Sequence, residues 1–217
     1  MKKETKKNFC ITVVLLGAFV LWTAAVRLVD VQAIGPQGSA VGFATINGWV
    51  HNLTGVHMSL YTITDWLGLV PLGIAMGFAF LGLIQWIKRK RLRQVDYSIL
   101  VLGGFYLVVI AVYVLFEVFV INYRPVLING CLEASYPSST TMLVLCVMPT
   151  AIMQLNARIK HYVLKRCAAF GITAFIIFVV IGRLISGVHW FTDIVGGALL
   201  SAGLAMLYHS ITGLEIK

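Results

Sequence analysis

The segment RLISGVHWFTDIVGG, residues 183–197, places an arginine, a histidine and an aspartate at the start of a long apolar run. His189 and Asp193 are four residues apart, so in a helix both side chains would lie on one face, about one 5.4 Å turn apart. Ionisable residues inside apolar segments are rare, and they generally have a partner or a function. The segment therefore predicts a helix in hydrophobic surroundings with a polar site at its beginning.

The composition of the whole chain is that of an integral membrane protein. Hydrophobic residues make up 59% of the 217 residues and charged residues only 12%, whereas soluble domains average about 25% charged residues. Apolar runs of roughly 20 residues are long enough to cross the ~30 Å hydrocarbon core of a bilayer. Because the runs are continuous rather than alternating, they exclude a strand barrel. We predict an all-α, polytopic protein, one domain over residues 1–217, with six transmembrane helices in one bundle, near residues 9–28, 60–87, 97–121, 140–155, 162–182 and 189–209. The fourth run is the weakest, because it is short and contains Pro149, which should kink it.

The net charge of +9 reflects membrane topology rather than nucleic-acid binding. The basic residues are concentrated in MKKETKK (1–7), KRKRLR (88–93) and RIKHYVLKR (158–166), which are the N-terminus and alternate loops. The positive-inside rule places these segments in the cytoplasm together with both termini. The first run is followed by Arg27 and Asp30 rather than by a small-residue cleavage site, so we expect it to remain as an anchor. The location that we predict is a bacterial plasma membrane.

This topology brings the remaining polar residues to the outer membrane face. The first outer segment, residues 29–59, mixes glycines and polar residues with spaced apolar ones, which predicts a re-entrant or interfacial helix. The other outer loops connect the third run to the fourth and the fifth to the sixth. They carry, or lead directly into, Arg124, Ser138, Ser139, Arg183, His189 and Asp193.

Together these residue types are suited to binding and transferring a phosphoryl group. Arginine presents a planar fork of donors that matches phosphate oxygens, and a helix N-terminus offers backbone N–H groups to anions. A neutral imidazole can attack phosphorus if a carboxylate holds its other nitrogen and fixes the tautomer. The pattern predicts phosphoryl transfer through a phosphohistidine. No metal-binding or nucleotide-binding motif occurs, so no cofactor or metal is expected.

Three segments resemble a known family: NYRP (122–125), YPSST (136–140) and GRLISGVHWFTD (182–193). They are similar to the signature segments K-x6-R-P, P-S-G-H and S-R-x5-H-x3-D of the type 2 phosphatidic acid phosphatase superfamily. The resemblance implies a six-helix membrane enzyme that hydrolyses lipid phosphates.

The resemblance also implies roles for individual residues. His189 would be the nucleophile, and Asp193 would orient it. The phosphate would be held by Arg124, Arg183 and Ser138, with the backbone at Ser139 adding a donor.

The chain departs from the family pattern at three positions. Glu117 stands where the family has lysine, and Gly182 stands where it has serine. Thr140 replaces the histidine that protonates the leaving group in the family. Glu133 and Tyr136, in the same loop, are alternative proton donors, and Glu117 could pair with an arginine.

These departures leave two classes of function open. Losing a general acid typically lowers the rate about 10²–10⁴-fold, but a phosphate leaving group, with a second pKa of about 6, needs the proton less than an alkoxide does. We therefore expect a phosphatase or phosphotransferase acting on a phospholipid or an isoprenoid phosphate, and a polyprenyl diphosphate would tolerate Thr140 best. The alternative is a non-catalytic relative that binds a lipid phosphate. The oligomeric state is not predicted.

Overall fold

The computed structural model describes residues 3–213, and within them the fold is all-α, as predicted. The long helices are joined by short connections that include two 3₁₀ turns, η1 (Pro36–Gly38) and η2 (Leu92–Gln94). The α-helices are α1 (Lys3–Leu28), α2 (Ala44–Thr54), α3 (Met58–Leu67), α4 (Leu69–Arg89), α5 (Tyr97–Val118), α6 (Ser139–Arg158), α7 (Tyr162–Ile185) and α8 (Phe191–Thr212). The predicted domain, 1–217, also includes terminal residues outside the described range.

The described helices contain six segments that are long and apolar enough to cross a membrane, which confirms the predicted number. Helices α3 and α4 together form the second of these segments, Met58–Arg89. The fourth is longer than predicted and extends over the whole of α6, with Pro149 inside it. The mean hydropathy of this segment is 1.4, against 2.4 for the segment in α1. Within it, 67% of an 18-residue stretch is buried inside the protein, against 17% for the corresponding stretch of α1. Because α6 faces other helices rather than lipid, its polar residues can be satisfied within the bundle.

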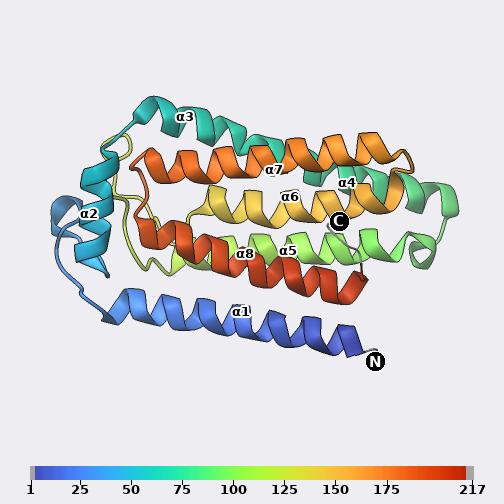
Figure 1. Cartoon of the computed structure of the whole chain (residues 1–217), viewed down its shortest axis with the longest axis horizontal. Helices are drawn as coiled ribbons and strands as arrows, with labels where there is room; N and C mark the ends of the chain where they lie inside the picture. Colours follow the sequence, from blue (N-terminus) through green and yellow to red (C-terminus); the bar gives the residue numbers. More distant parts are fainter. Residues whose placement is uncertain (1–2, 214–217) are drawn as a thin grey trace.

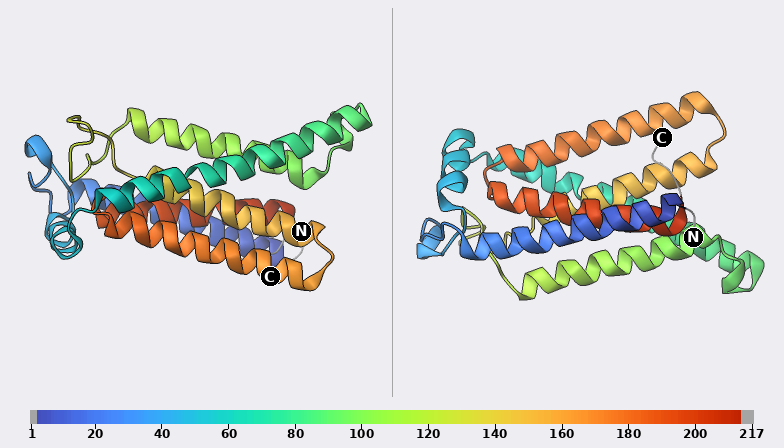
Figure 2. Two further views of the ribbon diagram at one scale, coloured as in Figure 1. Left: turned by 90° about the horizontal axis from the view of Figure 1, so that it is seen from above. Right: turned by 60° about the horizontal axis from the view of Figure 1, so that its bottom comes forward.

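Helices α6 and α8 form the interior of the bundle, and the other long helices surround them. Helix α8 packs against both α1 and α6, and α6 also packs against α7. Figure 1 shows α1 along one side of the bundle and α7 with α3 along the other, and the right view of Figure 2 shows α5 on the side opposite α7. Residues of α6 and α8 therefore contact other protein side chains over most of their length.

The two ends of the bundle differ in what they contain. The start of α1, the end of α8 and the α4–α5 and α6–α7 connections lie at one end, on the right of Figure 1. The α5–α6 and α7–α8 connections lie at the opposite end. The basic clusters at 88–93 and 158–166 are thus separated by the length of the bundle from the loops that carry His189 and Arg124.

Helix α2 lies across the end of the bundle that carries these loops (Figure 1). Asn47 anchors it: the side chain is fully buried and donates to the carbonyl of Gly42 at 2.8 Å and to the hydroxyl of Thr192 at 3.0 Å. The backbone N–H of Thr192 donates back to the Asn47 amide oxygen at 3.2 Å. These contacts fix α2 to the first turn of α8, beside the residues described next.

Candidate active site

His189 lies in the short connection between α7 and α8, where it is only 3% exposed. Its Nδ1 is 3.9 Å from Oδ2 of Asp193, one turn further along the chain. A third residue bridges this gap: the Ser135 hydroxyl lies 3.0 Å from His189 Nδ1 and donates to Asp193 Oδ2 at 2.5 Å. The histidine and the aspartate are therefore connected through a serine that the sequence analysis did not select.

The direction of these hydrogen bonds fixes the tautomer of His189. Asp193, when ionised, can only accept, so the hydroxyl of Ser135 donates to it and accepts from Nδ1–H. On the other side of the ring, Arg183 Nη2 lies 3.3 Å from Nε2, and a guanidinium can only donate. With Asp193 ionised, the lone pair of the imidazole is therefore on Nε2, where it accepts from Arg183.

His189 is also kept neutral. Its pKa lies well below the ordinary value, first because of burial and then because of the positive charges of Arg183 and Arg124. A neutral imidazole is the nucleophilic form, since protonation would occupy the attacking lone pair. The surroundings of His189 thus favour nucleophilic attack at neutral pH.

Asp193 is fixed by the backbone as well as by Ser135. Its Oδ2 accepts from the backbone N–H of Trp190 at 2.9 Å, and together with Trp190 it forms a capping box at the start of α8. The backbone carbonyl of Asp193 accepts from the N–H of Ser138 at 3.1 Å. The first turn of α8 is therefore joined directly to the start of α6. The same contacts hold the carboxylate of Asp193 beside Ser135.

The α5–α6 loop folds back on itself, and this places Arg124 and Ser135 near His189. The N–H of Arg124 donates to the carbonyl of Glu133 at 3.0 Å, and the N–H of Ser135 donates to the carbonyl of Asn122 at 2.9 Å. This pairing brings the two ends of the loop together, so Arg124 and Ser135 lie in the same site.

The two arginines share an aromatic partner from α3. Arg124 and Arg183 are 8% and 1% exposed, and their guanidinium carbons lie 5.6 Å and 4.8 Å from the ring centre of Tyr61. Arg124 Nη1 also donates to the Tyr61 hydroxyl at 3.4 Å. Stacking on an aromatic face holds a guanidinium flat while its edge stays available to an anion. Tyr61 therefore holds both arginines in one site.

Each arginine also has a carboxylate partner. Arg124 Nε lies 3.2 Å from Glu133 Oε2, and Arg183 Nη1 lies 3.4 Å from Asp65 Oδ1, one turn after Tyr61 on α3. Glu133, one of the two residues expected as alternative proton donors, therefore has its carboxylate against Arg124. Glu117, which was expected to pair with an arginine, forms no ion pair among residues 3–213, and the carboxylates beside Arg124 and Arg183 are Glu133 and Asp65.

Glu117 instead faces the same cavity as His189. It lies in the last turn of α5, and the cavity is also lined by Tyr113, Ser135 and Ser139. The space open to the centre of a water-sized sphere is about 10 Å³, close to the minimum for a single water molecule. A phosphate group is larger than this space, so the cavity beside Glu117 cannot hold one without movement of side chains.

The start of α6 provides the predicted donors only in part. The backbone N–H of Ser138 is already bonded to Asp193, whereas its fully buried hydroxyl has no hydrogen-bond partner among residues 3–213. Ser139, the first residue of α6, lines the cavity. Thr140 is 8% exposed, and its methyl group lies beside Gly68, where α3 meets α4. Thr140 therefore packs against the α3–α4 junction.

Tyr136 does not point its hydroxyl at His189. The side chain is 1% exposed, and the hydroxyl lies 2.7 Å from the hydroxyl of Thr23 on α1. A Cβ on Gly196 would come within 2.5 Å of the tyrosine ring, so glycine is required there. The hydroxyl of Tyr136, the other residue expected as a proton donor, is thus bonded to α1, and burial raises its pKa.

Gly182, the third departure from the family pattern, is explained by its neighbour on α3. A Cβ at this position would lie 2.7 Å from Cγ2 of Thr64, well below an ordinary van der Waals contact. The absence of a side chain lets α3 approach α7 closely, and α3 supplies both Tyr61 and Asp65. Glycine at position 182 therefore allows the close packing of α3 that places Tyr61 and Asp65 beside the arginines.

Restoring the family residue is expected to disturb this contact. Gly182→Ser should lower the midpoint of thermal unfolding by several degrees, because overpacking a tight contact typically costs about 1–3 kcal/mol. Thr64→Ser removes the clashing methyl and keeps the hydroxyl, so the double variant should regain most of the loss. The measurement is thermal unfolding of the purified variants, and a double variant no more stable than Gly182→Ser would exclude this explanation.

Three residues of the site were missed in the sequence: Tyr61, Asp65 and Ser135. Asp65 gave a signal, because it is an acidic residue inside a predicted span and Tyr61 lies four positions before it on the same helical face. Ser135 gave no such signal, since a serine in a polar loop is common and only the path of the loop places it beside His189.

The site lies in a bundle of six long apolar helices, and it combines a buried histidine in contact with Arg183 and a second arginine that shares the ring of Tyr61. Comparison with known families agrees: residues 118–217 match the model of the PAP2 superfamily. The predicted resemblance to the type 2 phosphatidic acid phosphatases is thereby confirmed, over the part of the chain that contains the three signature segments.

The fold is similar to that of a solved phosphatase. The crystal structure of the first transmembrane PAP2 type phosphatidylglycerolphosphate phosphatase from Bacillus subtilis matches with a TM-score of 0.58 and 19% sequence identity, over 93% of this chain and 96% of that chain. Among curated protein sequences, none matches significantly. The structural likeness confirms the six-helix fold of an integral membrane protein.

Proposed function

We propose that this protein is a phosphatase that removes phosphate from membrane lipid phosphates through a phosphohistidine at His189. The observation that carries the proposal is the hydrogen-bonded chain from Arg183 through His189 and Ser135 to Asp193, with Arg124 beside it. Such a chain supplies a neutral nucleophile, a fixed tautomer and a partner for the charge that develops on the ring. It does so within reach of two guanidinium groups suited to phosphate oxygens.

The reaction proceeds in two displacements at phosphorus. In the first, the Nε2 lone pair of His189 forms a bond to phosphorus while the bond to the leaving oxygen breaks and its electron pair departs with the leaving group. The positive charge on the ring is balanced through Ser135 by Asp193. In the second, a water molecule attacks the phosphohistidine, the N–P bond breaks, its electron pair returns to Nε2, and inorganic phosphate is released. An acceptor alcohol in place of water would make the same site a phosphotransferase.

We propose that the site faces outward and that both termini face the cytoplasm. The basic clusters, which the positive-inside rule assigns to the cytoplasm, are at the end of the bundle opposite the α7–α8 connection (Figure 1), and this connection contains His189. The substrate then lies in the outer leaflet, with its phosphate at the level of the arginines and its chains in the membrane.

The substrate class follows from the missing acid. Thr140 cannot protonate a leaving alkoxide, and both Glu133 and Tyr136 are committed to other partners. A diphosphate loses a phosphate monoester that is stable as an anion, so we propose a lipid diphosphate, such as a polyprenyl diphosphate, as the preferred substrate.

Phosphate release from a panel of lipid phosphates tests both the activity and the substrate class. The purified protein should release phosphate from a polyprenyl diphosphate at least about tenfold faster than from phosphatidic acid, a modest share of what a general acid contributes. A faster reaction with the monophosphate would contradict the proposed substrate class.

A second candidate is a non-catalytic lipid-phosphate-binding protein. It is favoured by Glu117 in place of lysine and by the ion pairs that already engage both arginines. Binding of a panel lipid that depends on Arg124 and Arg183, without release of phosphate from any lipid, would establish this candidate instead.

A further inference from the structure

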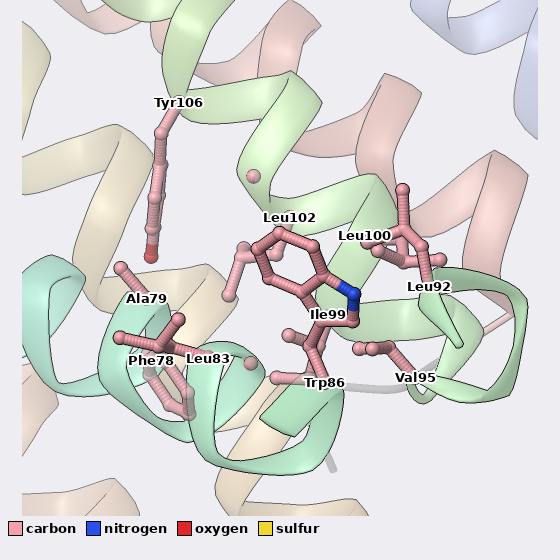
Figure 3. Close-up of a pocket in the computed structure, with 12 residues that line it drawn as sticks. Phe78, Ala79, Leu83, Trp86, Leu92, Val95, Ile99, Leu100, Leu102 and Tyr106 are labelled. Carbon is pink, nitrogen blue, oxygen red and sulfur yellow. The ribbon is translucent and has the colours of Figure 1, made fainter. Parts of the chain in front are cut away.

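A second candidate binding site lies at the opposite end of the bundle from His189, between α4 and α5. It is an apolar groove of about 300 Å³, at the lower end of the size range of ligand pockets. Figure 3 shows Phe78, Leu83 and Trp86 of α4 on one side, with Tyr106 at one extremity. The remaining lining residues are Ala79, Gly82, Leu92, Val95, Ile99, Leu100, Leu102 and Gly103.

The groove has a buried floor and an open side. Ile99 and Leu102 of α5 are 6% and 1% exposed, whereas Leu83 and Trp86 of α4 are 43% and 49% exposed. Since α4 and α5 both belong to membrane-spanning segments, the open side faces the bilayer. An occupant that enters from there must be hydrocarbon at this depth.

Basic residues alternate with groove residues at the cytoplasmic end. Within the segment from Trp86 to Val95, three residues line the groove, namely Trp86, Leu92 and Val95. The five basic residues of the KRKRLR cluster, 88–93, lie between these positions, and Leu92 is the leucine of the same cluster. The same short connection therefore contributes apolar side chains to the groove and places positive charge at the cytoplasmic edge of the groove.

Most of this charge is not neutralised by the protein. Arg89 pairs with Asp96 at 3.0 Å, and Asp96 also pairs with Arg158 at 3.4 Å. The pKa of Asp96 lies below its ordinary value, chiefly through the hydrogen bond from Gln85 and further through Arg89 and Arg158, so the carboxylate stays charged. Four other basic residues form no ion pair with any residue in the range 3–213: Lys88, Lys90, Arg91 and Arg93.

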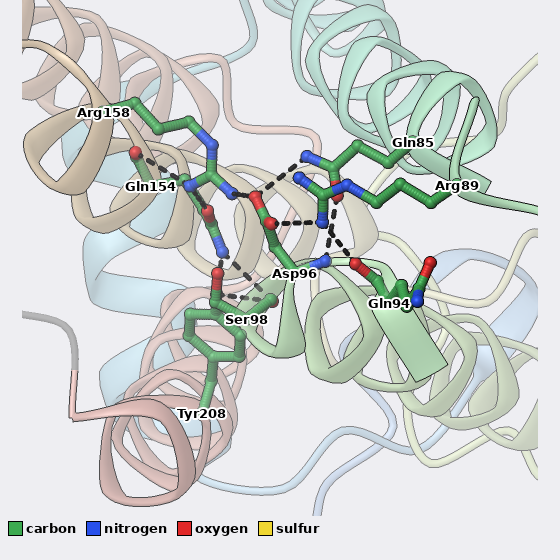
Figure 4. A network of polar contacts seen from close by, with 8 residues as sticks. All are labelled: Gln85, Arg89, Gln94, Asp96, Ser98, Gln154, Arg158 and Tyr208. Carbon is green, nitrogen blue, oxygen red and sulfur yellow. Dashed lines mark hydrogen bonds and ion pairs between the residues drawn. The ribbon is translucent and has the colours of Figure 1, made fainter. Parts of the chain in front are cut away.

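The network around Asp96 keeps this connection in place (Figure 4). The side chain of Gln85 donates to Asp96 at 2.8 Å and accepts from its backbone N–H at 2.9 Å. On the other side, Arg158 bonds to Gln154, which donates to the carbonyl of Ser98 at 3.1 Å. The contacts tie the end of α4, the start of α5 and the end of α6 together, so the groove and its basic edge are preformed.

We propose that this groove binds an anionic phospholipid of the cytoplasmic leaflet, with one acyl chain between α4 and α5 and the phosphate headgroup at the KRKRLR cluster. An apolar channel that ends in unpaired positive charge is complementary to a molecule with a hydrocarbon chain and an anionic head. Basic residues near the surface of an anionic membrane are attracted to its headgroups. The site is separate from the outward-facing site, and its occupant is bound rather than hydrolysed.

Two adjacent glycines of α5 provide a matched pair for the test. Gly103 lines the groove and Gly104 does not, and a Cβ at either position would meet no atom within 4 Å. Gly103→Leu should therefore place a side chain in the groove, whereas Gly104→Leu adds the same side chain elsewhere on the same helix.

Lipid binding by native mass spectrometry of the detergent-purified protein is the measurement, with phosphatidylglycerol and phosphatidylcholine of identical acyl chains as probes. We expect phosphatidylglycerol to bind at least about tenfold more tightly than phosphatidylcholine. Gly103→Leu should weaken phosphatidylglycerol binding by a similar factor, and Gly104→Leu should not. The double variant Arg91→Gln/Arg93→Gln, outside the spans, should remove most of the headgroup preference and leave chain binding intact.

Three results would overturn the proposal. Equal binding of both lipids would show that the basic cluster does not recognise the headgroup. Unchanged binding of phosphatidylglycerol by Gly103→Leu would show that the lipid binds outside the groove. A dimer in the wild type that Gly103→Leu dissociates, without any effect of lipid, would assign the groove to a second copy of the chain.

Discussion

Replacing His189 by alanine is expected to reduce phosphate release by at least about 10⁴-fold, because the variant lacks the atom that attacks phosphorus. Binding of the lipid phosphate should persist, since Arg124 and Arg183 remain. The measurement is the steady-state rate with the best substrate of the panel, together with the thermal unfolding midpoint to show that the variant is folded.

His161→Ala is the matched control. This histidine caps the start of α7 at the other end of the bundle, so its loss should leave the rate of the folded variant within about twofold of the wild type, because it cannot contact a substrate bound at His189. A folded His189→Ala variant that retains substantial turnover would mean that another group attacks phosphorus.

Asp193→Asn is expected to lower kcat by about 10²–10⁴-fold with little change in KM, the signature of a group that acts in the transition state. The asparagine amide can donate to the Ser135 hydroxyl, which would reverse the hydrogen-bond chain and favour the wrong tautomer of His189. The measurement is kcat and KM separately, over a range of pH.

Ser135→Ala provides the comparison within the same chain. It removes the bridge but leaves Asp193 3.9 Å from the ring, so its effect on kcat should be smaller, on the order of tenfold to a hundredfold for a positioning contact. Ser135→Thr, which restores a hydroxyl, should recover part of the rate. If Ser135→Ala were as active as the wild type, the bridge would have no role in positioning His189.

The fold could be predicted from the sequence because its main determinant is local. Each apolar run is long enough to span a bilayer by itself, and the basic clusters at 88–93 and 158–166 mark alternate ends without reference to any contact. The length of α6 was underestimated for a physical reason. Its low hydropathy follows from burial against other helices, and hydropathy measures affinity for lipid rather than for protein.

The site could be predicted as a set of residues but not as a geometry. The spacing of His189 and Asp193 indicated a shared face. It could not show that the carboxylate lies 3.9 Å from Nδ1 of the ring, with the hydroxyl of Ser135 bonded to both groups. The path of the α5–α6 loop determines that arrangement. Similarly, no local pattern indicates that a serine at Gly182 would meet Thr64, since the contact depends on how closely α3 approaches α7.

The central claim is that the phosphoryl group passes through Nε2 of His189. Rapid acid-free quenching of the wild-type protein during turnover, followed by peptide mass spectrometry, tests it most directly. Our account predicts a phosphoryl group on the imidazole of His189, formed at least as fast as the steady-state turnover and lost when substrate is exhausted. Turnover by the wild type with no phosphoryl group on His189 at any time, or with the label on another residue, would contradict it.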